Sequence, residues 1–173
     1  PCTLCVICAL RCTMRHSVRC ETLCCVCSEI TQNPTLQATS FNQQLNSWDV
    51  GRVTDMSYLL NEAKAFDKPL NSWNTSQVTD MDSIFKVSSA FNQQIDMWDT
   101  SRVGKLSRSF FSASEFNQPI GSWQTGQAAD MESLFFEARK FNQDLNAWDT
   151  SQVTQMKQIF QRSTIFDQPL QGW

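Results

Sequence analysis

Hydrophobic residues recur along this chain at one fixed interval, so that successive members of each row lie 25 positions apart. Two aromatic rows and one aliphatic row show the period most clearly. The rows are Phe41, Phe66, Phe91, Phe116, Phe141 and Phe166; Trp48, Trp73, Trp98, Trp123, Trp148 and Trp173; and Leu45, Leu70, Ile95, Ile120, Leu145 and Leu170. No insertion or deletion shifts the register over six copies, so the pattern indicates a repeat architecture with one structural unit per period.

The second part of each unit has helical periodicity. In the first copy the apolar residues are Met56, Leu59, Leu60, Ala63 and Phe66. Their spacing of i, i+3, i+4, i+7 and i+10 lines one face of an α-helix. The preceding Thr-Asp pair is typical of a helix N-cap. The pattern therefore predicts a short helix of about ten residues in each unit.

The segment before this helix predicts a short strand. The motifs RVTDM, QVTDM and QVTQM alternate polar and apolar residues around a β-branched valine. One such unit is too small to bury its apolar side chains alone, whereas stacked units bury them against one another. We therefore expect an α/β repeat solenoid in which each 25-residue unit contributes one short parallel strand and one short helix.

Cysteine usage divides the chain. All eight cysteines lie between Cys2 and Cys27, and none follows. This break predicts a Cys-rich leader over residues 1–30, either disordered or not a native domain, and a repeat solenoid of about six units over residues 31–173. Trp173 falls partway through a unit, so we expect the array to be truncated at this end.

Composition and charge argue against several classes of function. The net charge is -3, and there is no basic stripe that would indicate a nucleic-acid partner. No apolar run approaches the roughly 20 residues of a transmembrane helix. The only histidine, His16, lies in the Cys-rich segment, so the repeat region has no histidine base for a catalytic triad. We expect neither an enzyme nor a cofactor.

The repeat resembles the BspA-like leucine-rich-repeat family of bacterial surface proteins and mycoplasma-type lipoproteins. The run FNQQLNSWDVGRVTDMSYLL is similar to that family's unit, F-N-x-P-L-x-x-W-D-T-S-x-V-T-x-M-x-x-M-F, and the similarity extends from Phe41 to Trp173. The fourth copy departs from it with QTGQAAD, and the third has Gly104 where the family has threonine. The resemblance implies a right-handed leucine-rich-repeat-like solenoid at the cell surface or outside the cell, which serves display, adhesion or protein binding.

In such a solenoid, the outward positions of the strands form a binding face for a protein or cell-surface ligand. The candidate contact residues are Arg52, Thr54, Gln77, Thr79, Arg102, Gln127, Gln152 and Thr154. One alternative is a structural spacer within a larger surface protein. A third hypothesis is a metal-binding Cys-rich head fused to the repeat array.

Three further rows admit a structural and a ligand-binding interpretation, and we favour the structural one for each. The row Asn42, Asp67, Asn92, Asn117, Asn142 and Asp167 fits a ladder of bonds to backbone amides. The row Asp49, Asp99 and Asp149 fits turn residues better than calcium ligands, because each carboxylate lies about one coil from the next. The tryptophan row fits stacked core side chains better than a sugar platform.

The cysteine segment leaves more alternatives open. Cys2, Cys5, Cys8 and Cys12 have the spacing of a bacterial iron–sulfur run, although Thr13 replaces the usual proline. Thiolates there also suit zinc, with His16 as a spare ligand. A third option is a disulfide-stapled cap, in which the cysteines are oxidised in pairs. We favour an unstructured leader, so these four cysteines are weak metal candidates and no metal site is assigned.

Overall fold

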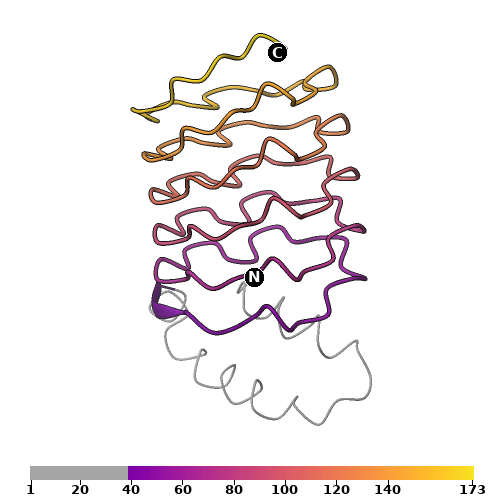
Figure 1. The fold of residues 1–173 in the computed structure, drawn as a ribbon, viewed down its shortest axis with the longest axis vertical. Coiled ribbons are helices and arrows are strands. Elements are labelled where there is room, and N and C mark those ends of the chain that lie inside the picture. Colours follow the sequence, from indigo (N-terminus) through magenta and orange to yellow (C-terminus); the bar gives the residue numbers. More distant parts are fainter. Residues whose placement is uncertain (1–38) are drawn as a thin grey trace.

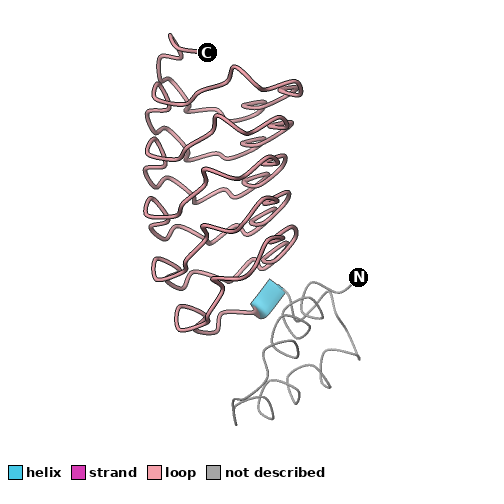
Figure 2. Ribbon diagram, turned by 90° about the vertical axis from the view of Figure 1, so that its right-hand side faces the viewer, coloured by secondary structure: helices cyan, strands magenta, loops and turns pink. Residues whose placement is uncertain are grey.

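The repeat units form a stack of coils. The computed structural model describes residues 39–173. Each repeat unit makes one circuit and returns to lie above the unit before it (Figure 1). Residues 39 and 40 are helical and form the short helix at the base of the described stack in Figure 2; within 39–173 no other helix and no strand is formed.

Every coil follows the same order of turns. In the coil that begins at Phe41, turns lie at residues 46–47 and 51–52, a run of turns spans 57–62, and a last turn lies at 64–65. Residue 55 forms the only β-bridge of this coil among the described residues. The bridges join equivalent residues in parallel orientation: Asp55 with Asp80, Asp80 with Lys105, Lys105 with Asp130, and Asp130 with Gln155.

The short strand expected in each unit is reduced to this single bridge. A turn at residues 51–52 immediately precedes the valine, and the run of turns follows the bridge. The extended segment between them is therefore too short for a ladder of several pairs. The expected strand is wrong, although the bridges that replace it are parallel.

The expected helix is also wrong, because only half of the amides in this segment bond within their own coil. The amides of Leu59, Asn61 and Ala63 donate to the carbonyl oxygen three residues back, at 3.2 Å, and close turns. The intervening amides donate to the next coil at 2.7–2.9 Å: Met56 to Asp80, Tyr58 to Asp82, Leu60 to Ile84, and Glu62 to Lys86. A helix would bond all of these amides internally and leave the carbonyl groups of the next coil without their partners.

The run of turns holds non-glycine residues in the left-handed region of the backbone. Two positions in each coil have φ between 54° and 64°: Tyr58, Glu62, Ser83, Val87, Arg108, Ser112, Ser133, Glu137, Gln158 and Arg162. Such a conformation costs an L-residue about 1–2 kcal/mol, and a β-branched residue such as Val87 adopts it least readily. The bonds between coils over-determine this backbone and offset its strain.

Aromatic ladders fill the interior, and the prediction that these rows form the core is confirmed. The ring centroids of successive members of the Phe41–Phe166 row lie 5.8–6.0 Å apart. A second phenylalanine ladder starts at Phe85, with centroid spacings of 5.5–5.6 Å.

The indoles in the middle of the tryptophan row are buried, with at most 3% of each residue exposed: Trp73, Trp98, Trp123 and Trp148. Each of these indoles donates Nε1–H to the Leu or Ile carbonyl of the coil below at 2.9–3.1 Å. Rings buried in this way leave no face for a sugar.

The Asn/Asp row is a structural ladder, as the sequence suggests, but its partners lie in the next coil. Each Oδ1 from Asn42 to Asn142 accepts the backbone amide of the equivalent residue 25 positions later, at 2.9–3.1 Å. From Asp67 onward the same oxygens also accept Nε2 of the following glutamine, for example Gln143 on Asn117. The row thus bonds one coil to the next.

We expect Asn117→Leu to destabilise the protein by about 1–3 kcal/mol, because the Asn142 amide and the Gln143 side chain lose their acceptor. Asn117→Asp is the matched control, since Asp67 makes the equivalent bonds to Asn92 and Gln93. Urea unfolding monitored by tryptophan fluorescence measures both. Equal losses in the two variants would contradict a ladder role for this oxygen.

A pair of glycine variants tests the strained turns. Glu62 has a φ of 61°, whereas Lys64 in the same coil lies outside the left-handed region. Glycine relieves strain only at the first position, so we expect Glu62→Gly to be about 1 kcal/mol more stable than Lys64→Gly. The measurement is the free energy of unfolding in urea, and the reverse order would show that residue 62 is not strained.

Candidate binding face

The eight residues predicted to contact a partner form two exposed rows, which we call the polar face. Its members are Arg52, Thr54, Gln77, Thr79, Arg102, Gln127, Gln152 and Thr154, and all are exposed. The residue between the two rows points inward: Val53, Val78, Val103 and Ala128 are at most 4% exposed. This alternation of buried and exposed side chains positions the face, and the role of its residues in binding stays a prediction.

Backbone hydrogen bonds between coils fix one row of the polar face, the row that contains Thr54, Thr79 and Thr154. The amides of Thr79, Gly104, Ala129 and Thr154 each donate to the carbonyl of the equivalent residue in the coil before, at 2.8–2.9 Å. The hydroxyls of Thr79 and Thr154 donate to the same carbonyls at 3.1 Å. These threonines therefore use their donors within the stack and offer a partner only an acceptor oxygen.

The two arginines of the polar face differ in whether their guanidinium groups have a hydrogen-bond partner. Arg102 donates from NH1 to Oε1 of Gln77 at 2.7 Å. The Arg52 side chain makes no hydrogen bond or ion pair within the part of the chain that the structure describes. Its guanidinium is thus available to a carboxylate of a partner, which it can hold through two parallel hydrogen bonds.

The bridge row beside the polar face carries charges that sequence reasoning missed as a group. Its members are Asp55, Asp80, Lys105, Asp130 and Gln155. Lys105 Nζ lies 2.8 Å from Asp80 Oδ2, and the hydrogen bond and the charge of Asp80 raise the pKa of Lys105. The sequence signal that could have revealed this ion pair is a pair of opposite charges 25 residues apart, at equivalent positions of successive units. Lys140 and Glu115 have the same spacing, and they lie 2.5 Å apart.

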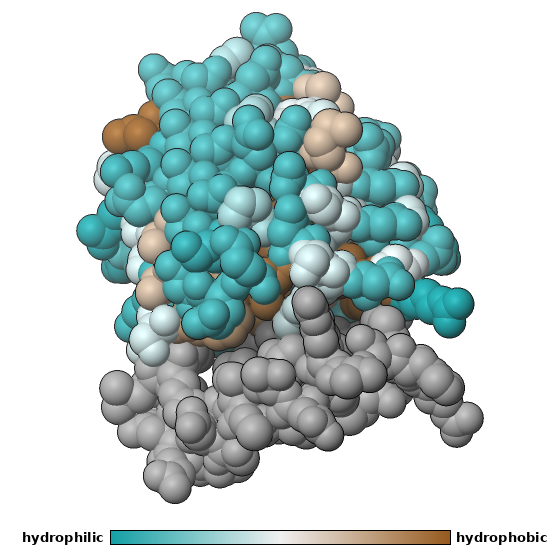
Figure 3. All heavy atoms as spheres, turned by 60° about the horizontal axis from the view of Figure 1, so that its bottom comes forward, coloured by the Kyte–Doolittle hydropathy of each residue, from teal (hydrophilic) through white to brown (hydrophobic). Residues whose placement is uncertain are grey.

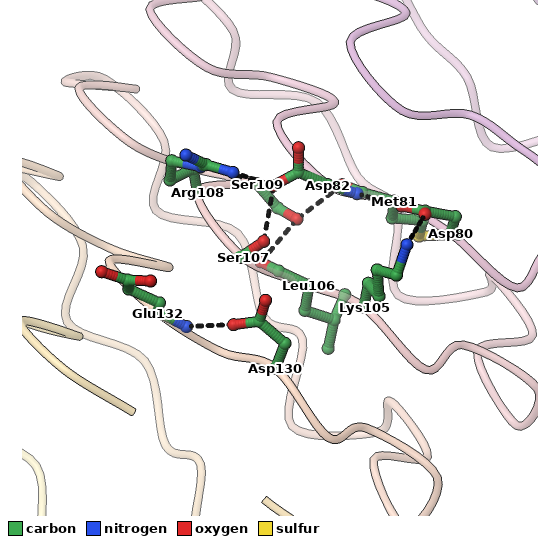
Figure 4. A network of polar contacts seen from close by, with 10 residues as sticks. All are labelled: Asp80, Met81, Asp82, Lys105, Leu106, Ser107, Arg108, Ser109, Asp130 and Glu132. Atoms are coloured by element: carbon green, nitrogen blue, oxygen red, sulfur yellow. Dashed lines mark hydrogen bonds and ion pairs between the residues drawn. The ribbon is translucent and has the colours of Figure 1, made fainter. Parts of the chain in front are cut away.

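A buried carboxylate lies at the centre of the polar network drawn in Figure 4. Asp82 is only 8% exposed. Its Oδ1 accepts hydrogen bonds from Ser107 Oγ at 2.5 Å and from Arg108 NH2 at 3.1 Å, and the charge of Arg108, in the next coil, neutralises it. Sequence reasoning did not single out these residues.

Burial by itself raises the pKa of Asp82. Hydrogen bonds from Ser107, Tyr58 and Arg108, with the positive charge of Arg108, outweigh it, so the pKa lies below the ordinary value for an aspartate. Burial likewise acts to lower the pKa of Arg108, but the hydrogen bond and charge of Asp82 raise it overall. A carboxylate held in its charged form is a poor proton acceptor, so this network suits cohesion between coils better than acid–base chemistry.

The row weighed as calcium ligands forms local turns. Oδ1 of Asp49, Asp99 and Asp149 accepts the amide two residues later at 2.9–3.1 Å. The Ser101 and Ser151 bonds lower the pKa of Asp99 and Asp149. No three Asp, Glu, His or Cys side chains within residues 39–173 are grouped to hold a metal ion. Cys2, Cys5, Cys8 and Cys12 lie outside the described residues.

The face of the described coils drawn in Figure 3 is mostly polar. Small separate apolar patches interrupt it. Among the residues that the structure covers, no helix has the length and hydrophobicity needed to span a bilayer.

Stacked coils, laddered interiors and exposed polar rows define the class: this is a repeat protein built from one unit per coil. The chain belongs to the family described as "Mycoplasma protein of unknown function, DUF285", whose sequence pattern matches residues 30–105 and 88–173. No curated protein and no solved structure shows significant similarity to it.

The Asp82 network predicts a pH-dependent contribution to stability. A lowered pKa means that folding favours the charged carboxylate, so the contribution is present above the pKa of about 3.9 of an unfolded aspartate and is lost as the pH falls through the folded value. We expect Asp82→Asn to destabilise the protein by about 1–2 kcal/mol near neutral pH. The difference from the parent protein should shrink as the pH drops below about 4.

Thermal unfolding of both proteins at a series of pH values measures this difference. A difference that stays constant across the series would show that the Asp82 charge does not contribute.

Proposed function

We propose that this chain is a non-enzymatic binding module, displayed at a cell surface, that contacts a protein or cell-surface ligand through the polar face. The observation that carries the proposal is the geometry of that face. The eight residues are exposed, bonds between coils fix the backbone of the row that contains Thr79 and Thr154, and Arg52 is unpaired within the described residues. A rigid face that is ordered before binding binds at a lower entropic cost than mobile loops do.

The resemblance to BspA-like leucine-rich repeats supports the surface location and a right-handed solenoid as parts of the same proposal. The length of the repeat unit and the parallel bridges agree with it. The run of turns at residues 57–62 differs from the helix that we expected in each unit. The family match supports the repeat and leaves the binding role to experiment.

A structural spacer is the second candidate, and one observation favours it. Many polar groups of the described coils already form hydrogen bonds between coils, including Arg102 with Gln77 and the hydroxyls of Thr79 and Thr154. A spacer needs this cohesion and no free contact residues. A metal-binding head would depend on the cysteines, which lie outside the described residues.

Charge reversal on the polar face tests the binding proposal. The labelled chain is incubated with intact cultured animal cells, and the bound label is measured by flow cytometry. We expect Arg52→Glu and Arg102→Glu each to reduce bound label about tenfold, because arginines that anchor an interface commonly contribute more than about 1 kcal/mol.

Lys68→Glu is the matched control, since it makes the same charge change away from the polar face and should bind as the parent does. Equal binding by all variants rejects this face as the contact surface. No binding by the parent chain favours the spacer.

A further inference from the structure

One edge of the stack is positively charged although the repeat region is acidic. This edge, which we call the aromatic edge, consists of residues 61–65 and their equivalents 86–90, 111–115, 136–140 and 161–165. Its first segment, residues 61–65, lies next to residues 39 and 40, which form the short helix in Figure 1. The Ala65 amide donates a hydrogen bond to the Thr39 carbonyl oxygen. Residues 30–173 carry 15 acidic and 11 basic side chains, but the aromatic edge has 5 of the basic and only 3 of the acidic ones.

Two phenylalanines interrupt an otherwise polar row on this edge. Phe111 and Phe136 are half-buried, and their rings stack with centroids 4.6 Å apart and planes 4° apart. The equivalent residues in the other coils are Asn61, Lys86 and Gln161. The coils therefore tolerate polar side chains here, so the core does not require this aromatic pair.

A cation lies over each end of the pair. Lys86 Nζ is 5.9 Å from the Phe111 ring centre, and the Arg162 guanidinium is 5.5 Å from that of Phe136. Lys86 makes no ion pair within the described residues, and Arg162 reaches Glu137 only at 3.5 Å. Exposed cation–π contacts contribute about 0.5–1 kcal/mol, so both cations can turn toward a stronger anionic partner at little cost.

We propose that the aromatic edge is a docking surface for an acidic peptide segment that carries aromatic side chains. Lys86 and Arg162 supply charge for carboxylates at both ends of the site. The outer edges of the two phenylalanine rings, together with Ile165, which is 49% exposed, supply the apolar contact. Charge complementarity favours an acidic occupant, since this edge carries 5 basic and 3 acidic side chains within an acidic array. A peptide fits better than an anionic membrane, because half-buried rings do not protrude far enough to insert among lipids.

A defined peptide set tests this proposal on the whole chain. The probe is a fluorescein-labelled peptide of sequence Glu-Phe-Glu-Glu-Phe-Glu, and the readout is fluorescence anisotropy. Two comparison peptides replace every Glu with Lys or every Phe with Ser. We expect binding of the first peptide only, weakening as salt is added.

Substitutions borrowed from other coils are expected to keep the fold intact, because the equivalent positions already carry these side chains. Phe111→Gln and Phe136→Gln introduce the side chain of Gln161, and we expect each to weaken binding by about tenfold. Lys86→Asn introduces the side chain of Asn61 and should weaken binding and reduce its salt dependence. Met97→Ser is the control: it removes another exposed apolar side chain, 76% exposed, and places there the serine found at Ser72 and Ser122.

Three results would overturn the proposal. The first is equal peptide affinity in the parent, Phe111→Gln and Phe136→Gln proteins. The second is equal binding of the lysine peptide, which would show that charge does not select the occupant. The third is binding to vesicles that contain phosphatidylserine without binding to any peptide, which would identify the edge as a membrane contact. Arg52→Glu should not affect peptide binding, so this test stands apart from that of the polar face.

Discussion

The hydrogen bond from an amide of one coil to a carbonyl of the next is the interaction on which the rest of this structure depends. In the first described coil, the amides of Met56, Tyr58, Leu60 and Glu62 all point to the following coil, and the later coils repeat the arrangement. Because these bonds join the same two positions of every pair of successive coils, they impose one length on every unit. An inserted residue would shift every later row relative to the rows below it, which explains why the period is unbroken.

The same register aligns the side chains. Each phenylalanine lies on the phenylalanine of the coil below, and each indole donor meets a carbonyl of that coil. Asn117 and its equivalents extend the backbone pattern into side chains by accepting an amide of the next coil. Burial of large rings supplies the main driving force, whereas the polar ladders select the alignment, because an offset would leave buried donors and acceptors unpaired.

This cohesion limits where function can reside. Asp82, Ser107 and Asn117 carry polar groups of the kind that bind ligands, but these groups form hydrogen bonds between coils. Positions that the repeat does not need remain for recognition. The polar face and the aromatic edge meet this condition in different ways: Arg52 has no partner within the described residues, and Phe111 stands where other coils carry polar side chains.

By itself, the sequence determined the period, the aromatic core and the exposure of the polar face, because the order of hydrophobic and polar residues along the chain records which side chains are buried and which are exposed. It also indicated structural roles for Asn42 and Asp49 and their equivalents.

Only the tertiary structure decided the backbone conformation of residues 56–63. The spacing of Met56, Leu59, Leu60 and Ala63 records which side chains face the core, and a helix and a run of turns bury the same set. The two conformations differ in which carbonyl group accepts the hydrogen bond of every second amide. In the run of turns the acceptors belong to the next coil. The ion pairs across coils and the stacked pair of Phe111 and Phe136 depend on the same alignment, so they too emerged only when the coils were stacked.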